Sequence, residues 1–67
     1  MKMKKADMAR ELTKIKIAWW EITDGKNHQH KQGDLYKALM KGTKKDIERD
    51  LENYEGKMER AKIIAIV

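Results

Sequence analysis

Apolar residues recur at helical spacing through the last third of this 67-residue chain. They follow one another in steps of four or three residues, at Ile47, Leu51, Tyr54, Met58, Ala61 and Ala65. Side chains at these intervals share one face of an α-helix. Thr43 precedes the pattern as a suitable N-cap, with Asp46 three residues later in a box-like arrangement. We therefore predict a long helix from Lys44 to about Ile64, with Gly56 nearly opposite the apolar face.

A second apolar face of the same kind lies near the start of the chain. Its members are Met8, Leu12, Ile15, Trp19 and Ile22. Gly25 follows and suits the left-handed position just after a helix, so we predict a helix from Ala6 to Thr23. The alternation of Ile15, Ile17 and Trp19 leaves a β-hairpin with a turn at residues 23–26 as an alternative. Its returning arm, residues 27–32, would contain no apolar residue.

A short apolar segment separates the two long patterns. After a polar loop over residues 26–32, Leu35, Tyr36, Leu39 and Met40 predict a short helix that ends at Gly42, with Asp34 as its N-cap. The fold class that follows is all-α, with two long helices packed as an antiparallel hairpin and a short helix between them. We expect residues 1–67 to form a single small helical domain, with residues 1–5 as a flexible basic arm.

Charge is divided unevenly along the chain. Residues 1–45 hold 12 Lys/Arg and 5 Asp/Glu, a net charge of +7, whereas residues 46–67 hold 4 and 6, a net charge of −2. These values sum to the +5 of the whole chain, in which 40% of residues are charged. A chain of 67 residues with this many charged positions has few apolar side chains to bury, so its core is marginal. Small scaffolds of this kind often complete their cores by association.

Residue types used in common catalytic centres are missing. The chain has neither cysteine nor serine, so those nucleophiles are absent. The acidic pairs Asp46/Asp50 and Glu48/Glu52 are four residues apart on a predicted exposed helix, which favours a solvated face over acid–base chemistry. No glycine-rich phosphate loop occurs. We predict that the protein is not an enzyme and that it uses no cofactor.

His28 and His30 invite a metal interpretation, because two imidazoles two residues apart can share an ion when the backbone is extended. Zinc needs three or four ligands, and the only carboxylates nearby are Asp24 and Asp34. We therefore expect a solvated polar loop and no metal site.

Trp20 raises a separate question, because it stands beside Trp19 and points about 100° away from it on a helix. Ile17, three residues earlier, lies on the same side as Trp20. One interpretation places Trp20 across the short helix, where it closes the core. The other makes Ile17 and Trp20 an exposed apolar patch that binds a second subunit or another protein, since tryptophan is enriched in such contacts.

The tail of the chain favours association. Its apolar side chains point around a helix rather than along one face, at Ile63, Ile64, Ile66 and Val67. Exposing each costs about 1.5–3 kcal/mol relative to full burial. We expect a homo-oligomer in which these residues and the Ile17/Trp20 patch bind a partner. A frayed terminus, or a native chain that continues further, is the alternative.

Nucleic acid is the competing partner. The candidate contacts are lysines in the arm and the turn near residue 42, at Lys2, Lys4, Lys5, Lys41, Lys44 and Lys45. Residues 34–51 loosely resemble a helix-turn-helix, but Lys37, Lys41 and Glu48 occupy positions that should be buried. Acidic residues in its second helix would be repelled by phosphates.

No apolar run approaches the roughly 20 residues that a membrane-spanning helix needs. Glu11, Glu21 and Asp24 also interrupt the basic face of the first helix, which disfavours contact with a membrane surface. We expect a cytoplasmic protein without a membrane partner. The function predicted from the sequence is a small regulatory accessory protein that binds another macromolecule.

Overall fold

The computed structural model describes the backbone of residues 3–66 and the side chains of residues 3–61. The predicted all-α class is confirmed over this part of the chain, which contains no strand. The elements are α1 (Lys5–Asp24), the 3-10 turn η1 (Gln29–Lys31), α2 (Gln32–Met40) and α3 (Lys44–Ile66). The alternative β-hairpin is wrong, because residues 15–23 are helical throughout.

The ends of the long helices follow the predicted local chemistry. Gly25 adopts a left-handed conformation with a φ of 72°, and its N–H donates to the Glu21 carbonyl over 2.9 Å. Glycine reaches this conformation without steric cost, so it ends α1. At the start of α3, the Asp46 backbone N–H donates to Thr43 Oγ1 over 3.2 Å. Hydrogen bonds from Thr43 lower the pKa of the Asp46 carboxyl, with a smaller contribution from Arg49.

The start of α2 differs from the prediction. Asp34 lies in the first turn instead of at the N-cap, because η1 leads directly into a helix that begins at Gln32. Lys31 is the N-cap residue, and its side chain makes no capping hydrogen bond. A preceding helical turn therefore takes the place of the capping side chain that the sequence suggested.

The core forms where all three helices meet. Leu12 of α1 is fully buried against Met8 and Ala9 of its own helix and Ile47 and Leu51 of α3, and α2 contributes the half-buried Tyr36, Leu39 and Met40. Thr13 is also buried, and its hydroxyl donates to the Ala9 carbonyl over 2.7 Å. Its polar group is thus satisfied within the helix.

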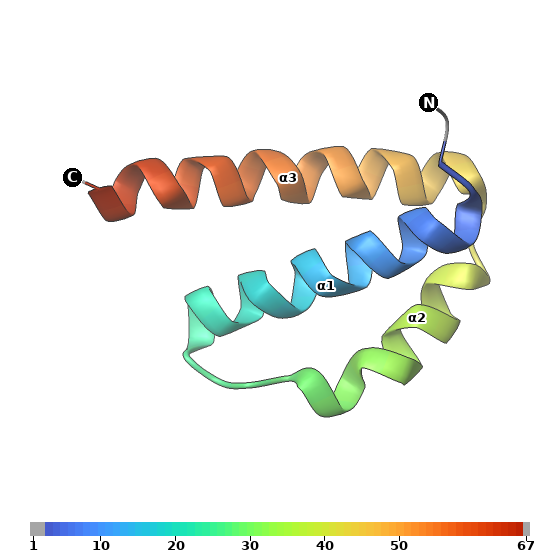
Figure 1. Ribbon diagram of the computed structural model, residues 1–67, viewed down its shortest axis with the longest axis horizontal. Helices are drawn as coiled ribbons and strands as arrows, with labels where there is room; N and C mark the ends of the chain where they lie inside the picture. The colour runs from blue at the N-terminus through green and yellow to red at the C-terminus, as the bar shows by residue number, and fades with distance from the viewer. Residues whose placement is uncertain (1–2, 67) are drawn as a thin grey trace.

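The direction of the two long helices corrects the predicted antiparallel pairing. Figure 1 shows α1 and α3 running in the same direction. The helix that connects them in the chain, α2, runs back in the opposite direction. Contacts agree: Lys16 of α1 lies 5.4 Å from the ring centroid of Tyr54, and Trp19 lies 5.9 Å from Lys57 Nζ, so later residues of α1 meet later residues of α3. The physical reason is that the nine residues of α2 carry the chain back towards the start of α1 before α3 begins.

The three helices lie side by side in the view of Figure 1, with α1 between α2 and α3. Burial fades along α1: Ile17 is buried, the tryptophans are half-buried and Ile22 is 56% exposed. Ile22 therefore lies at the exposed edge of the predicted apolar face, because α1 and α3 draw apart towards their C-terminal ends (Figure 1), and it borders a hollow with Trp19 and Lys57.

Candidate functional site

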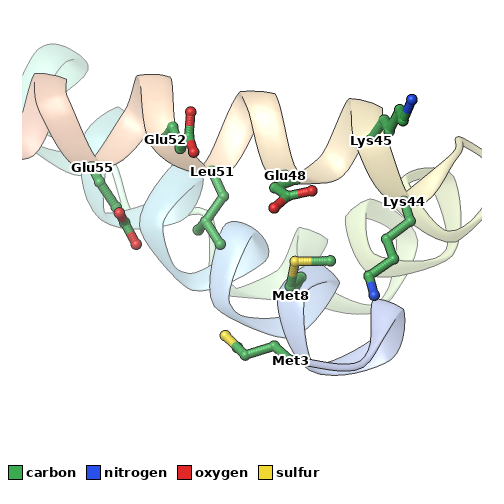
Figure 2. Close-up of a pocket in the computed structure, with 8 residues that line it drawn as sticks. All are labelled: Met3, Met8, Lys44, Lys45, Glu48, Leu51, Glu52 and Glu55. Atoms are coloured by element: carbon green, nitrogen blue, oxygen red, sulfur yellow. The ribbon is translucent and has the colours of Figure 1, made fainter. Parts of the chain in front are cut away.

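Two adjoining hollows run along one side of the α1/α3 pair. The first has a volume of about 480 Å³ and is lined by Met3, Met8, Lys44, Lys45, Glu48, Leu51, Glu52 and Glu55 (Figure 2). The second, about 530 Å³, is lined by Ile15, Glu52, Glu55, Gly56, Met58 and Glu59. They share Glu52 and Glu55, so we treat them as one feature, the α1/α3 groove. No α2 residue lines it.

The acidic rim of the groove follows from the pattern of α3. Glu48, Glu52, Glu55 and Glu59 each come one residue after a member of the apolar face, so they repeat its four-three-four spacing. One residue is a rotation of about 100°. This places all four carboxylates on one flank of α3, beside the line where α3 packs on α1. All four residues are exposed.

The floor of the groove is apolar and rich in methionine. Met8 and Leu51 point towards each other from α1 and α3 in Figure 2, with Met3 alongside, and Ile15 and Met58 continue the floor. Met3 is 41% exposed. Methionine is unbranched and polarisable, so it adapts to partners of different shape. The floor can therefore accommodate an apolar side chain without rearrangement of the helices.

None of the rim glutamates is in an ion pair within residues 3–61. The ion pairs in that range are Asp7–Arg10, Glu11–Lys14, Asp24–His28 and Asp46–Arg49. At the other end of the groove, Lys44 points towards the start of α1 in Figure 2, whereas Lys45 points away. The groove thus has an acidic side and a basic end.

That basic end gathers most of the lysines predicted to contact nucleic acid. Lys4 is the N-cap residue of α1 and Lys5 its first helical residue, while Lys41 ends α2 and Lys44 and Lys45 begin α3. Because α1 and α3 run in the same direction, their starts lie at the same end of the molecule (Figure 1). Lys2 lies outside the described residues, and the flexible arm at residues 1–5 stays a prediction.

A second cluster lies at the opposite end of α1, around Trp20. The His28 ring packs edge-on against Trp20 with centroids 5.5 Å apart, and His28 Nε2 donates to Asp24 Oδ2 over 2.8 Å. A hydrogen bond from the Lys26 backbone N–H, then that of His28, lowers the pKa of the Asp24 carboxyl. The His28 side chain is only 15% exposed, and its buried Nδ1 has no hydrogen-bond partner within the described part of the chain.

The predicted Ile17/Trp20 patch is corrected by this arrangement. Ile17 is 2% exposed, so its side chain is buried within the chain and offers no surface to a partner. The reason is that α1 packs on two sides, against α3 and against α2, so a second flank of the helix is covered. Trp20 is half-buried and packs against His28 of the loop. Its contact with a partner stays a prediction.

The remaining predicted contacts cannot be placed. The side chains of Ile63, Ile64 and Ile66 lie outside the described residues, and so does the whole of Val67.

His28 and His30 do not form a shared site. Their ring centroids are 6.4 Å apart, and His28 is hydrogen-bonded to Asp24. Over the side chains that the structure describes, no group of three or more histidine, cysteine or acidic residues could hold a metal ion.

No protein family, curated protein or solved structure was found to match this chain. Among the described residues, none of the helices is sufficiently long and apolar to cross a membrane. The groove itself was missed by sequence reasoning, which treated Glu48 and Glu52 as a solvated face. One sequence feature could have indicated the groove: each rim glutamate directly follows a residue of the apolar face, so the glutamates share one flank of the helix.

Proposed function

We propose that this protein is a non-enzymatic interaction module that binds another protein through the α1/α3 groove. The observation that carries the proposal is the groove itself: an apolar floor between two packed helices, on the side of the pair that α2 does not line. Domains commonly bury apolar faces between two layers of secondary structure. A partner on the groove would cover this apolar floor.

The apolar floor favours a protein partner over a small ligand. The hollows are open and are lined largely by exposed side chains, whereas small-molecule sites usually enclose most of their ligand. The partner includes a second copy of this chain as one case, which would make the protein a homo-oligomer. A regulatory role in the cytoplasm, as the sequence suggested, is compatible with this proposal.

Site-directed crosslinking tests the proposal. The chain has no cysteine, so a single introduced cysteine carries a photo-crosslinker at one known position. We expect Met58→Cys, in the groove floor, to capture a specific protein in extracts of the source cells. The matched variant Lys37→Cys, on the exposed face of α2, should not. Capture from neither position, or equal capture from both, would contradict a binding site in the groove.

Nucleic-acid binding is the second candidate, and one observation favours it. Lys4, Lys5, Lys41, Lys44 and Lys45 lie at one end of the molecule because α1 and α3 are parallel (Figure 1). Phosphate contacts give a binding constant that falls with salt, with a logarithmic slope of about −0.9 for each duplex phosphate neutralised. A mobility-shift titration of duplex DNA at two salt concentrations tests this. A slope near zero would remove this candidate.

A further inference from the structure

We propose that the α1/α3 groove receives a basic amphipathic helix from a partner protein, docked antiparallel to α1 and α3. This inference rests on the proposed function and adds the chemistry and direction of the partner. It is carried by three features of the groove: its length and apolar floor, its acidic rim, which makes no ion pair within residues 3–61, and its basic end.

The length of the groove suits a helix. From Glu48 to Glu59, α3 advances about 16 Å at 1.5 Å per residue, which is three helical turns. A helix laid along this line would present apolar side chains at intervals of three and four residues to the floor formed by Leu51, Ile15 and Met58. An extended peptide would place alternate side chains on opposite faces and would find no exposed strand edge here.

The rim specifies the charge of that helix. Four exposed glutamates line one flank of α3, and within residues 3–61 none of them is in an ion pair. Lysine or arginine flanking the apolar stripe of the partner would meet them along the whole groove. The chain as a whole carries +5, but screening over a Debye length of about 8 Å lets the local row of carboxylates dominate.

The two ends of the groove specify direction. The N-termini of α1 and α3 lie together with Lys44 at one end (Figures 1 and 2). Helix N-termini carry partial positive charge, and the C-terminus of a helix carries partial negative charge. The C-terminal end of the partner helix is therefore stabilised next to Lys44, and its N-terminal end lies near Glu59.

A second copy of this chain is the less suitable occupant. The exposed large apolar side chains among the described residues are Met3 and Ile22. They lie at opposite ends of α1 and do not form a stripe on a basic helix. The described surface of one copy therefore lacks an exposed apolar stripe, flanked by basic residues, that could dock in the groove of another copy.

The test uses the intact protein and a designed peptide of about 14 residues, with leucine at helical spacing and lysine elsewhere. Fluorescence anisotropy should show binding with a Kd of about 10 µM or tighter. A peptide with the same composition but a scrambled leucine pattern should bind at least about tenfold more weakly. Glutamate in place of lysine should abolish binding. Equal affinity for the ordered and scrambled peptides would overturn the proposal.

Matched variants locate the site. Glu52→Gln with Glu55→Gln removes two rim charges and should weaken peptide binding about three- to tenfold. Glu21→Gln with Asp34→Asn removes two exposed acids elsewhere and should change it less than about twofold. Circular dichroism confirms that each variant is folded. Equal effects of the two pairs would show that binding depends on net charge alone and would overturn the site.

Direction is measured with spin labels. A nitroxide on Lys45→Cys should lie closer to a label at the C-terminus of the peptide than to one at its N-terminus, and a nitroxide on Arg60→Cys should show the reverse order. The opposite result would overturn the proposed orientation. If crosslinking from Met58→Cys identifies a partner but the lysine peptide does not bind, the interaction function stands and the basic-helix inference fails. Sedimentation that shows wild-type dimers dissociating when the peptide binds would instead assign the groove to a second copy.

Discussion

The two sides of the α1/α3 pair carry different chemistry although they flank the same apolar contact. On one side, Tyr36, Leu39 and Met40 of α2 pack against the core that α1 and α3 share. Arg10 lies 5.8 Å from the Tyr36 ring centroid, and Lys16 and Lys57 both lie over the ring of Tyr54. On the other side, methionines and a row of glutamates line an open groove.

This difference separates stability from recognition. The covered side holds buried side chains whose loss leaves a cavity, whereas the open side holds exposed charges with no partner among the described residues. Substitutions on the covered side should therefore change the free energy of unfolding, and substitutions on the open side should change binding. Each prediction below tests that separation, beginning with the largest expected effect.

Truncation of the central buried side chain should have the largest effect. Leu12 is fully buried between α1, α2 and α3, so Leu12→Ala should destabilise the protein by about 2–5 kcal/mol. That is comparable with the whole stability of a domain of this size. Urea denaturation followed by circular dichroism measures it. The control Ile22→Ala, at an exposed position of the same helix, should cost less than about 0.5 kcal/mol.

Loss of the cap that links α2 to α3 should have a smaller effect. Thr43 Oγ1 accepts the Asp46 backbone N–H, and Thr43→Ala should cost about 1 kcal/mol. Thr43→Ser keeps the hydroxyl and should retain most of the stability. Equal thermal midpoints for wild type and Thr43→Ala would show that this cap does not contribute to the stability of the fold.

Acid should weaken the hydrogen bonds that Asp24 and Asp46 accept near the helix ends. The pKa values of Asp24 and Asp46 are lowered below the usual 3.8 by their hydrogen bonds. A lowered folded-state pKa contributes stability above the unfolded pKa, and that stability is lost as pH falls through the folded value. We expect the thermal midpoint to fall below about pH 4. Asp46→Asn should flatten part of this dependence, and an unchanged profile would contradict a stabilising role for the Asp46 carboxylate at the start of α3.

Neutralising the rim should affect stability least. Glu52→Gln with Glu55→Gln should shift the free energy of unfolding by no more than about 0.5 kcal/mol, because both side chains are exposed and unpaired within the described residues. Chemical denaturation provides the measurement. A loss as large as that of Thr43→Ala would mean that the rim supports the fold rather than a partner.

Local features of the fold could be predicted from the sequence, because they depend on nearby residues. The two long helices, the Gly25 end and the Thr43 cap all follow from spacing and side-chain type within a few positions. The direction of α3 could not be predicted, since the spacing of apolar residues identifies the packed face of each helix but not the direction in which the helices run. The direction of α3 depends on the position in space at which α2 ends, and that position is set by the turn at η1 and by the length of α2.

The candidate site was less predictable for a related reason. Ile17 looked like part of a free patch because the sequence does not show that α2 covers a second flank of α1. Glu48 and Glu52 are exposed, as predicted, but the sequence alone does not show that their flank of α3 borders a groove. Both features depend on which flank of a helix a distant segment covers.

The shared direction of α1 and α3 also has a mechanical consequence. Tension applied between Lys5, at the start of α1, and Ala61, near the end of α3, would pull the two helices past each other along their length (Figure 1). Contacts from Met8 to Trp19 would then bear the load together, in shear. An antiparallel hairpin pulled from its open end would lose its contacts one at a time, like a zip. Forced unfolding is governed by the unfolding barrier, so this small domain should resist stretching better than its modest core suggests.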